Sequence, residues 1–442
     1  MVELIRSLLK RVLPRTAWER LQQRYWLDCY PLRVDYCPLM LPWFPGRRRT
    51  PIGELHRYAT FGGRLREVPW LTRLCVVIGA LLWPIRVAVG GTRAFREYSS
   101  GVKAVYGIVK WRQLGRMLRQ AGINNVPPLF FYRYRLFTPR ESARADRYIF
   151  PDERIVLFPR VAITFGLNHP LIYKDTFFER GRELDLPVVP ALVKFEGGAV
   201  ARWYASSRDL PERDLAFKPV DRFGSQGFER WRYDASTRQW RRGRESLDAN
   251  GLLEHCCQTG KPRRHVLQAC VVNHKELRPL SGVGLSTLRV VTYRRPNGDC
   301  GVLIACMRMP TGDSPVDNFS AHGVAAPIEV HTGTLGPAVS KDPQLGEFTH
   351  HPDSGAPIAG FVIPRFQETL EVALAAQSAF PEVPSVGWDV AITDDGPLLL
   401  EANLNWGIDI VQIVGRGPLG DTKYPELYFE HLASQRPALV AE

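Results

Sequence analysis

The amino-acid sequence predicts an α+β fold that is preceded by a basic, mainly helical region. Short apolar runs with strand character alternate with helical segments along residues 151–425, and the last two runs form a hairpin, as in antiparallel sheets. Positive charge is concentrated before residue 150. We expect four parts: a basic helical region (1–100), a helical lead-in (101–150), the main domain (151–425) and a C-terminal tail (426–442).

The N-terminal region has its own charge balance. Residues 1–150 contain 27 Lys/Arg and 9 Asp/Glu, whereas the other 292 residues contain 31 and 36. The net charge of +13 therefore comes from the first third of the chain. Such a basic block needs a negative partner, which can be anionic lipid, nucleic acid or a polyanionic substrate.

Apolar stretches in the same region favour lipid, and no nucleic acid is expected. Residues 1–12 have the pattern of an amphipathic interfacial helix, and Trp43 and Phe44 precede an arginine triplet. The apolar run 74–85 is shorter than the roughly 20 residues that span a bilayer, and Pro84 and Arg86 close it. We expect a cytoplasmic protein at the inner face of a membrane. Packing of these stretches on the main domain is the alternative.

The spacing of the cysteines adds little to this picture. The eight cysteines include no Cys-x-x-Cys pair and no regular spacing, which suggests neither a disulfide scaffold nor a zinc ribbon. A reducing cytosol is the natural compartment for such a chain.

The remaining elements follow in chain order. Residues 103–120 have the period of an amphipathic helix, and Gly122 follows as a stop signal. Beyond a boundary near residue 145, helices are expected at 175–184 and 364–380. Strands are expected at 155–158, 187–193, 266–272, 286–293 and 300–309, with two more around a glycine loop in 215–233 and a final hairpin at 386–403.

The final hairpin has a turn that sets its register. Strands 386–393 and 397–403 are joined by Asp-Asp-Gly, a three-residue loop that ends in Gly396. Such a loop suits a type I turn followed by a left-handed residue. We therefore expect Thr393 to pair with Pro397.

Counting back from this turn places Asp389 opposite Glu401, with Cβ atoms roughly 5 Å apart. Asn403 shares their face, whereas Leu398 and Leu400 are expected on the other. Opposed carboxylates repel each other unless a cation lies between them. Two carboxylates and an amide oxygen suit Mg²⁺, so the hairpin is a candidate metal site. A solvated acidic face is the alternative.

A glycine loop after an apolar strand is a candidate phosphate site. Lys218 ends the strand 215–219, where a buried ammonium needs an anionic partner. Glycines let the backbone approach phosphate oxygens closely. Lys174, at the start of a helix, is a second candidate for the same phosphates. An ordinary hairpin loop and a surface lysine are the alternatives. The loop consists of Gly224, Ser225, Gln226 and Gly227.

Two arginines alternate with apolar neighbours on predicted strands. Arg289 lies within Ser-Thr-Leu-Arg-Val-Val-Thr-Tyr, and Arg308 follows Ile-Ala-Cys-Met. Both side chains are expected to need an ionic partner. That partner is a substrate or a structural carboxylate, and the sequence leaves both open.

Taken in order, these motifs resemble the ATP-grasp superfamily, whose fold has two α+β subdomains that grip ATP. They are a lysine before Leu-Pro-Val-Val-Pro, Phe-Lys-Pro with a glycine flap, and Asp…Glu-x-Asn on a terminal hairpin. The sugar-transfer-associated ATP-grasp branch is similar in more detail, through Ser-Thr-Leu-Arg-Val-Val-Thr, Val-Asp-Asn-Phe-Ser-Ala-His-Gly and Gly-Trp-Asp-Val. The resemblance covers about residues 105–415 and does not account for residues 1–100.

The resemblance implies a set of nucleotide contacts. Lys174 and Lys218 would contact the ATP phosphates, and the flap would fold over them. His274 or Glu276 would lie near the ribose. The strand whose backbone contacts adenine would be Gln268, Ala269, Cys270 and Val271, and many relatives carry Glu at the position of Gln268.

It also implies the residues around the reaction centre. Mg²⁺ would be held by Asp389, Glu401 and Asn403. Three further residues resemble the positions that α-L-glutamate ligases of the superfamily use around the γ-phosphate and the acyl group. They are Arg289, Arg308 and Asn318.

The implied chemistry is ATP-dependent ligation. A carboxylate attacks the γ-phosphate to give an acyl phosphate, which an amine or similar nucleophile then attacks. The substrates could be linked to a sugar, a polysaccharide or an envelope precursor. The alternatives are a kinase that phosphorylates a hydroxyl and a membrane-surface scaffold that binds nucleotide without turnover. The sequence does not identify the substrates or the oligomeric state.

Overall fold

The computed structural model describes residues 50–61, 70–151, 169–222, 226–312 and 323–434, together with 153, 154, 157, 158 and 319. The interfacial helix predicted at residues 1–12, and Trp43 and Phe44, lie outside this part. The chain divides into two compact units. The first is Met1–Val161, Asp342–Gln344 and Gly417–Tyr428; the second is Ala162–Lys341, Leu345–Arg416 and Phe429–Glu442.

The described part of the first unit is helical. Trp83 donates a hydrogen bond from Nε1 to the carbonyl of Ala121 at 2.9 Å, and Tyr98 stacks on Tyr132 with ring centroids 5.4 Å apart. These contacts pack the long helix α4 against α5 and α6. The elements are α3 (Pro51–Phe61), α4 (Trp70–Tyr106), α5 (Lys110–Asn124), α6 (Pro128–Arg133), α7 (Pro139–Ala143), η3 (Ala145–Arg147) and η8 (Leu419–Asp421).

Several sequence predictions for this unit are wrong. The helix expected at 103–120 is divided, because Gly107 adopts φ of +67° between α4 and α5, a conformation that favours glycine. Pro84 lies inside α4, which continues past it for many residues. Residues 157 and 158, expected in a strand, are helical. Among the helices that the structure describes, none is long and apolar enough to cross a membrane.

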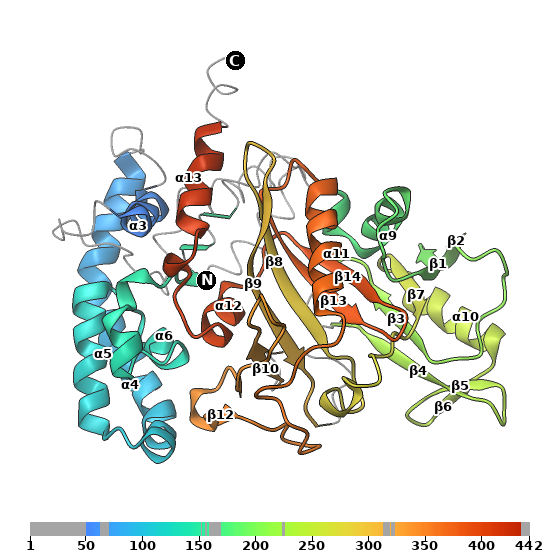
Figure 1. Cartoon of the computed structure of the whole chain (residues 1–442), viewed down its shortest axis with the longest axis horizontal. Helices are drawn as coiled ribbons and strands as arrows, with labels where there is room; N and C mark the ends of the chain where they lie inside the picture. The colour runs from blue at the N-terminus through green and yellow to red at the C-terminus, as the bar shows by residue number, and fades with distance from the viewer. Residues whose placement is uncertain are drawn as a thin grey trace. The chain divides into compact units, whose positions relative to one another are not determined.

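The second unit contains two seven-stranded sheets, and all pairings between their named strands are antiparallel (Figure 1). The first sheet has the order β2-β1-β7-β3-β4-β5-β6. Helices α9 (Lys174–Glu183) and α10 (Ala249–Thr259) contact strands of this sheet. Its strands are β1 (Ala191–Glu196), β2 (Ala199–Trp203), β3 (Leu215–Pro219), β4 (Glu229–Asp234), β5 (Gln239–Arg242), β6 (Glu245–Leu247) and β7 (His265–Ala269).

The second sheet has the order β12-β11-β10-β9-β8-β13-β14, and α11 (Phe366–Ala379) lies along it (Figure 1). Thr292 of the sheet donates to Gln377 of α11 at 2.7 Å, and Trp388 donates to Thr292 at 2.8 Å. Its strands are β8 (Thr287–Arg294), β9 (Cys300–Met309), β10 (Val324–Pro327), β11 (Ala338–Val339), β12 (Glu347–Phe348), β13 (Ser385–Ile392) and β14 (Pro397–Asn403).

The remaining elements are short. Two of them, η5 (Pro170–Ile172) and η6 (Arg278–Leu280), belong to the second unit, as does α12 (Ile408–Val414). Two others contain residues of both units, namely η7 (Pro343–Leu345) and α13 (Tyr424–Ser434).

The two sheets meet where the chain enters β1. Val188 forms a parallel bridge with Leu399 of β14, the amide of Val189 donates to the Leu399 carbonyl at 3.1 Å, and the Leu399 amide donates to Pro187 at 2.7 Å. The start of the first sheet is thereby tied to the hairpin of the second. This join sets α9, which precedes it, beside β14.

The structure confirms the α+β class and most of the predicted elements. The helices at 175–184 and 364–380, the two strands around the glycine loop, and the strands near 266, 286 and 300 are present. The strand expected at 187–193 begins instead at Ala191. Strands β2, β5 and β6 and helix α10 were not predicted.

Candidate active site

The hairpin β13–β14 holds the predicted acid pair. Asp389 pairs with Glu401 and Gly387 pairs with Asn403, so the register predicted for the two carboxylates is confirmed. Asp389 is buried, whereas the Glu401 side chain is 28% exposed. The two acids therefore differ in their access to solvent and to a ligand.

The turn reaches this register by another route than the one predicted. Ile392, and not Thr393, pairs with Pro397. The register then shifts by one residue between Asp389 and Val390. This bulge restores the acid pair that a regular ladder from the observed turn would have missed.

The bulge also changes which leucine enters the core. Leu399 is buried with Val390 in the hydrophobic cluster, while Leu398 and Leu400 are only partly buried. The prediction that Leu398 and Leu400 both lie on the face opposite the acid pair is therefore wrong, because Leu398 pairs with Ala391, which shares the face of Asp389. A shift of one residue moves a side chain to the opposite face of a strand.

Asp389 lies between two arginines on neighbouring strands. Arg289 of β8 donates from Nε to Oδ1 and from Nη2 to Oδ2, the latter at 3.1 Å, and Nη2 of Arg308 on β9 lies 3.0 Å from Oδ2. Burial raises the pKa of Asp389, but the two guanidinium charges outweigh burial and hold its pKa well below the ordinary value. This ionised trio carries one net positive charge.

Arg308 is oriented by a residue that the sequence did not single out. Thr287 pairs with Arg308 across β8 and β9, and its Oγ1 accepts a hydrogen bond from Arg308 Nε at 3.1 Å. The signal was present in the sequence, because Thr287 and Arg289 are two residues apart and so share a face of β8.

Glu401 connects the hairpin to the start of helix α9. Its Oε2 lies 3.2 Å from Nζ of Lys174, and its Oε1 accepts from Nδ2 of Asn403 at 3.4 Å. Lys174 is the first residue of α9, and its Nζ also donates to the carbonyl of Arg222 at 2.8 Å. The predicted phosphate lysine and two of the predicted metal ligands therefore lie together.

Lys218 forms no direct ion pair with any of the residues that the structure describes. Its side chain, near the end of β3, makes no hydrogen bond or ion pair with them. Burial, together with the charge of Lys174, lowers the pKa of Lys218 to about 8, although Glu401 acts in the opposite direction. A buried ammonium in this state favours an anionic ligand.

Only half of the predicted glycine flap lies in the described part of the chain. Gly224 and Ser225 lie outside it. Gln226 accepts a hydrogen bond from Arg222 Nη1 at 3.2 Å. Gly227 has φ of +76°, so a side chain there would be strained.

The predicted adenine strand is β7 and the residues after it. Gln268 is buried and donates from Nε2 to the carbonyl of Val189 at 3.2 Å, while Ala269 is the last residue of β7. The amide of Cys270 donates to Asp214 at 2.8 Å, and burial raises the pKa of its thiol to about 11. Within the described residues, the backbone N–H of Val271 donates to no other backbone group.

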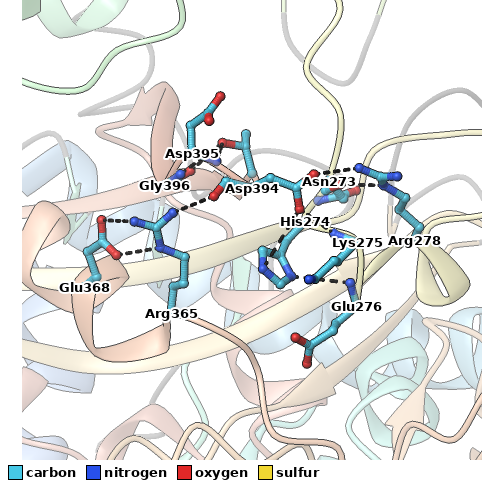
Figure 2. A network of polar contacts seen from close by, with 11 residues as sticks. Asn273, His274, Lys275, Glu276, Arg278, Arg365, Glu368, Asp394, Asp395 and Gly396 are labelled. Atoms are coloured by element: carbon cyan, nitrogen blue, oxygen red, sulfur yellow. Dashed lines mark hydrogen bonds and ion pairs between the residues drawn. The ribbon is translucent and has the colours of Figure 1, made fainter.

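The loop after β7 is fixed to the turn of the hairpin (Figure 2). The amide of His274 donates to the Ile392 carbonyl at 2.8 Å. Asp394 accepts from the amide of Lys275 at 2.8 Å and from Nη2 of Arg278 at 2.7 Å. These bonds couple the loop that follows the predicted adenine strand to the strand that carries Asp389.

The same network reaches α11. Arg365 donates from Nη1 to the backbone carbonyl of Asp394 at 2.8 Å. Its Nε and Nη2 donate to the carboxylate of Glu368 (Figure 2). We call these contacts of Asp394 with Lys275, Arg278 and Arg365 the Asp394 clamp. It could not be predicted from the sequence, because Asp394 is far from its partners along the chain. The ribose candidates His274 and Glu276 thus lie at the turn end of the hairpin, about 10 Å along the strand from Asp389.

Asp175, next to Lys174, is a further residue that the sequence did not identify. It is fully buried, and its Oδ2 accepts from Lys194 Nζ and from Arg264 Nη1, each at 2.8 Å. Arg264 also lies over the ring of Tyr173 at 4.9 Å. The start of α9 is therefore held against β1 and the residue that precedes β7, and this holds Lys174 in place.

The donor set at the hairpin fits a divalent cation only in part. Asp389, Glu401 and Asn403 share one face and supply hard oxygen donors. Asp389 is already neutralised by two arginines, so Glu401 and Asn403 fit the role better. Within the described residues, no group of three or more His, Cys, Asp or Glu side chains could hold a metal. Water and phosphate oxygens would have to complete the coordination, as is usual for Mg²⁺.

The charged members of the predicted site are brought together around the hairpin. Lys174 and Lys218 lie beside Glu401. Arg289 and Arg308 form ion pairs with Asp389. Asp389 in turn pairs with Glu401 across the two strands of the hairpin. Asn318 lies outside the described residues. The four cations and two carboxylates carry a net charge of +2, which suits a polyphosphate.

Residues 204–422 match the family model described as sugar-transfer associated ATP-grasp. No curated protein sequence matches the chain. Similar solved structures include an ADP complex of N5-carboxyaminoimidazole ribonucleotide synthetase, with 10% identity, a TM-score of 0.31, and coverage of 57% of this chain and 52% of that one. D-alanyl-alanine synthetase A from Vibrio cholerae O1 biovar eltor has 11% identity, a TM-score of 0.34 and coverage of 60% and 65%. D-alanine–D-alanine ligase from Bacillus anthracis has 12% identity and a TM-score of 0.32, and the match covers 61% of this chain and 70% of that one. The chain spans less than two thirds of the first two proteins.

Proposed function

Residues 204–422 belong to the sugar-transfer-associated ATP-grasp family, and on that premise we propose that the chain is an ATP-dependent ligase that couples a carboxylate to an amine or a similar nucleophile. One observation carries the proposal. The partly buried Lys218 forms no ion pair within the described residues, although it lies near Lys174 and Glu401. The phosphates of ATP would supply the missing anion.

The nucleotide site follows from the same residues. The phosphates would contact Lys174 and Lys218 beneath the flap at 224–227, and the base would lie along residues 268–271. The N–H of Val271, which has no backbone acceptor in the described part of the chain, would donate to adenine. The clamp at Asp394 would hold the loop that carries the ribose contacts.

Two residues are best placed to hold Mg²⁺. Glu401 and Asn403 are partly exposed and adjacent, while Asp389 lies opposite. A bound Mg²⁺ would neutralise phosphate charge and orient the γ-phosphoryl group.

The arginines would act on the γ-phosphoryl group as it is transferred to the substrate carboxylate. In the first step, an oxygen of the substrate carboxylate attacks the γ-phosphorus, the bond to the β,γ-bridging oxygen breaks, and ADP leaves. Arg308 and Arg289 would stabilise the negative charge on the transferred phosphoryl group. In the second step, an amine attacks the acyl carbon, loses a proton, and phosphate leaves. The pairing with Asp389 orients both guanidinium groups before the substrate binds.

The substrates are proposed only by their chemical class. We propose an acid or acceptor linked to a sugar, a polysaccharide or an envelope precursor, in keeping with the description of the family. We also propose a location in the cytoplasm at the inner face of a membrane, because the first 150 residues hold the chain's excess of positive charge.

Hydroxylamine trapping tests the reaction class. Purified protein is incubated with MgATP, hydroxylamine and a pool of carboxylic acids, with Glu401→Gln as the control. The proposal predicts a hydroxamate and stoichiometric ADP from the wild type alone. A stable phosphorylated product without hydroxamate would show a kinase. Binding of ATP with no turnover in any pool would show a scaffold.

A further inference from the structure

A stripe of large aliphatic side chains is exposed on α4. Leu81, Ile85 and Val89 are 72%, 62% and 69% exposed and follow one another at four-residue intervals. Side chains with this spacing share one side of a helix. Together with three flanking residues they define what we call the α4 stripe: Val77, Ile78, Leu81, Leu82, Ile85 and Val89.

The opposite side of α4 is the one that packs on the unit. Trp83, Ala94, Tyr98 and Val102 are buried there, and Trp83 donates to Ala121 of α5. The α4 stripe is therefore not the core-facing side of an amphipathic helix. Soluble surfaces seldom carry so many contiguous aliphatic side chains without a partner.

The stripe continues into basic residues along the same helix. Arg96 and Lys103 are exposed, and their angular positions at 100° per residue fall on the side that carries Ile85 and Val89. Residues 70–124, which cover α4 and α5, contain nine Lys/Arg and one acidic residue. One side of the helix is thus apolar in its first half and cationic in its second.

We propose that the α4 stripe docks on the surface of a bilayer that contains anionic lipid. The aliphatic side chains would enter the boundary between headgroups and acyl chains, and Arg96 and Lys103 would lie among the phosphates. Trp111, 69% exposed on α5, is a residue type enriched at this depth. A helix that lies in the interface agrees with α4 being too polar to span a membrane.

Charge favours lipid over a second copy of the chain. In a symmetric dimer through the stripe, each partner would bring the same Arg96 and Lys103 to the interface. Those like charges would repel, whereas anionic headgroups complement them. The inference extends the proposed location of the enzyme and does not depend on the ligation chemistry.

Vesicle flotation of the full chain tests the docking surface. Wild type is expected to float with phosphatidylcholine vesicles that contain phosphatidylglycerol, and far less with phosphatidylcholine alone. The double variant Leu81→Glu, Ile85→Glu should lower the partition coefficient roughly 100-fold. Replacing Arg96 and Lys103 with Gln should lower it about 25-fold and weaken its salt dependence. Val362→Glu is the matched control, because Val362 is 57% exposed on the second unit.

The outcomes separate the possible partners. Equal flotation of the Leu81→Glu, Ile85→Glu variant and the wild type would overturn the proposal. The proposal would also be overturned if light scattering showed that the wild type is a dimer without lipid and that the Leu81→Glu, Ile85→Glu variant is not. A fall in melting temperature without lipid, with no flotation of the wild type, would show instead that the chain covers its own stripe. ATP turnover in the same samples reports on the proposed ligase separately.

Discussion

Replacement of Lys218 with Met gives the sharpest prediction for the nucleotide site. The substitution keeps most of the apolar stem and removes the charge. In the free protein the pKa of Lys218 is about 8, against an ordinary 10.5, because the ammonium is buried near Lys174. Folding with this charge in place therefore costs about 3 kcal/mol at neutral pH, at about 1.4 kcal/mol per pKa unit.

The sign of the pH dependence follows from the same shift. Because the pKa is lower in the folded state, the unfolded chain binds more protons between pH 8 and 10.5. The wild type therefore gains stability from this residue as the pH rises through that window. Lys218→Met should be more stable than the wild type at pH 7, by up to about 3 kcal/mol, and the difference should shrink toward pH 10.5. The corresponding rise in melting temperature is up to about 10 °C.

Thermal unfolding with and without MgATP measures both effects. Lys218→Met should melt higher than the wild type without nucleotide and should gain no further stability from MgATP. Lys261→Met, at an exposed lysine of the same unit, should match the wild type in both. The reasoning is refuted if Lys218→Met melts lower than the wild type without nucleotide, or if MgATP protects it equally.

Three further predictions concern the neighbouring residues. Glu401→Gln should lower ADP release at least about 100-fold, and an unchanged rate would remove Glu401 from the site. Asp389→Asn should destabilise the second unit by about 3–5 kcal/mol in urea unfolding, because it removes the carboxylate that pairs with the buried Arg289 and with the partly buried Arg308. Since the folded pKa of Asp389 is lowered, its contribution is complete above about pH 4 and lost at lower pH, so the gap between wild type and variant should narrow in acid. Asp394→Ala should raise KM for ATP about tenfold with little change in kcat, and the reverse pattern would place Asp394 in the chemistry instead.

The sequence was most informative where a local pattern decides the structure. The strand around Arg289 and the helix at 175–184 were predictable from the period of their apolar residues. The Asp389–Glu401 pair was predictable because a hairpin turn limits the register. The bulge beside Asp389 was not, since it depends on how β13 also pairs with β8.

Contacts between distant segments could not be predicted. The need of Arg289 for an ionic partner was predictable, but the identity of Asp389 as that partner required the order of the strands in the sheet. The clamp at Asp394 joins residues more than 100 positions apart. Pro84 was expected, with Arg86, to close an apolar run, and helix α4 continues through it. The helix tolerates the loss of one backbone hydrogen bond because its other face is packed.

The central claim is that the γ-phosphoryl group of ATP is transferred to a carboxylate. An oxygen-isotope measurement tests it most directly: wild-type protein, MgATP and an amine pool are combined with carboxylic acids labelled with ¹⁸O in the carboxyl group. An acyl phosphate that is attacked at carbon leaves one ¹⁸O in the phosphate released. We predict labelled phosphate from the wild type and none from Glu401→Gln. Turnover by the wild type that releases only unlabelled phosphate would contradict the assignment.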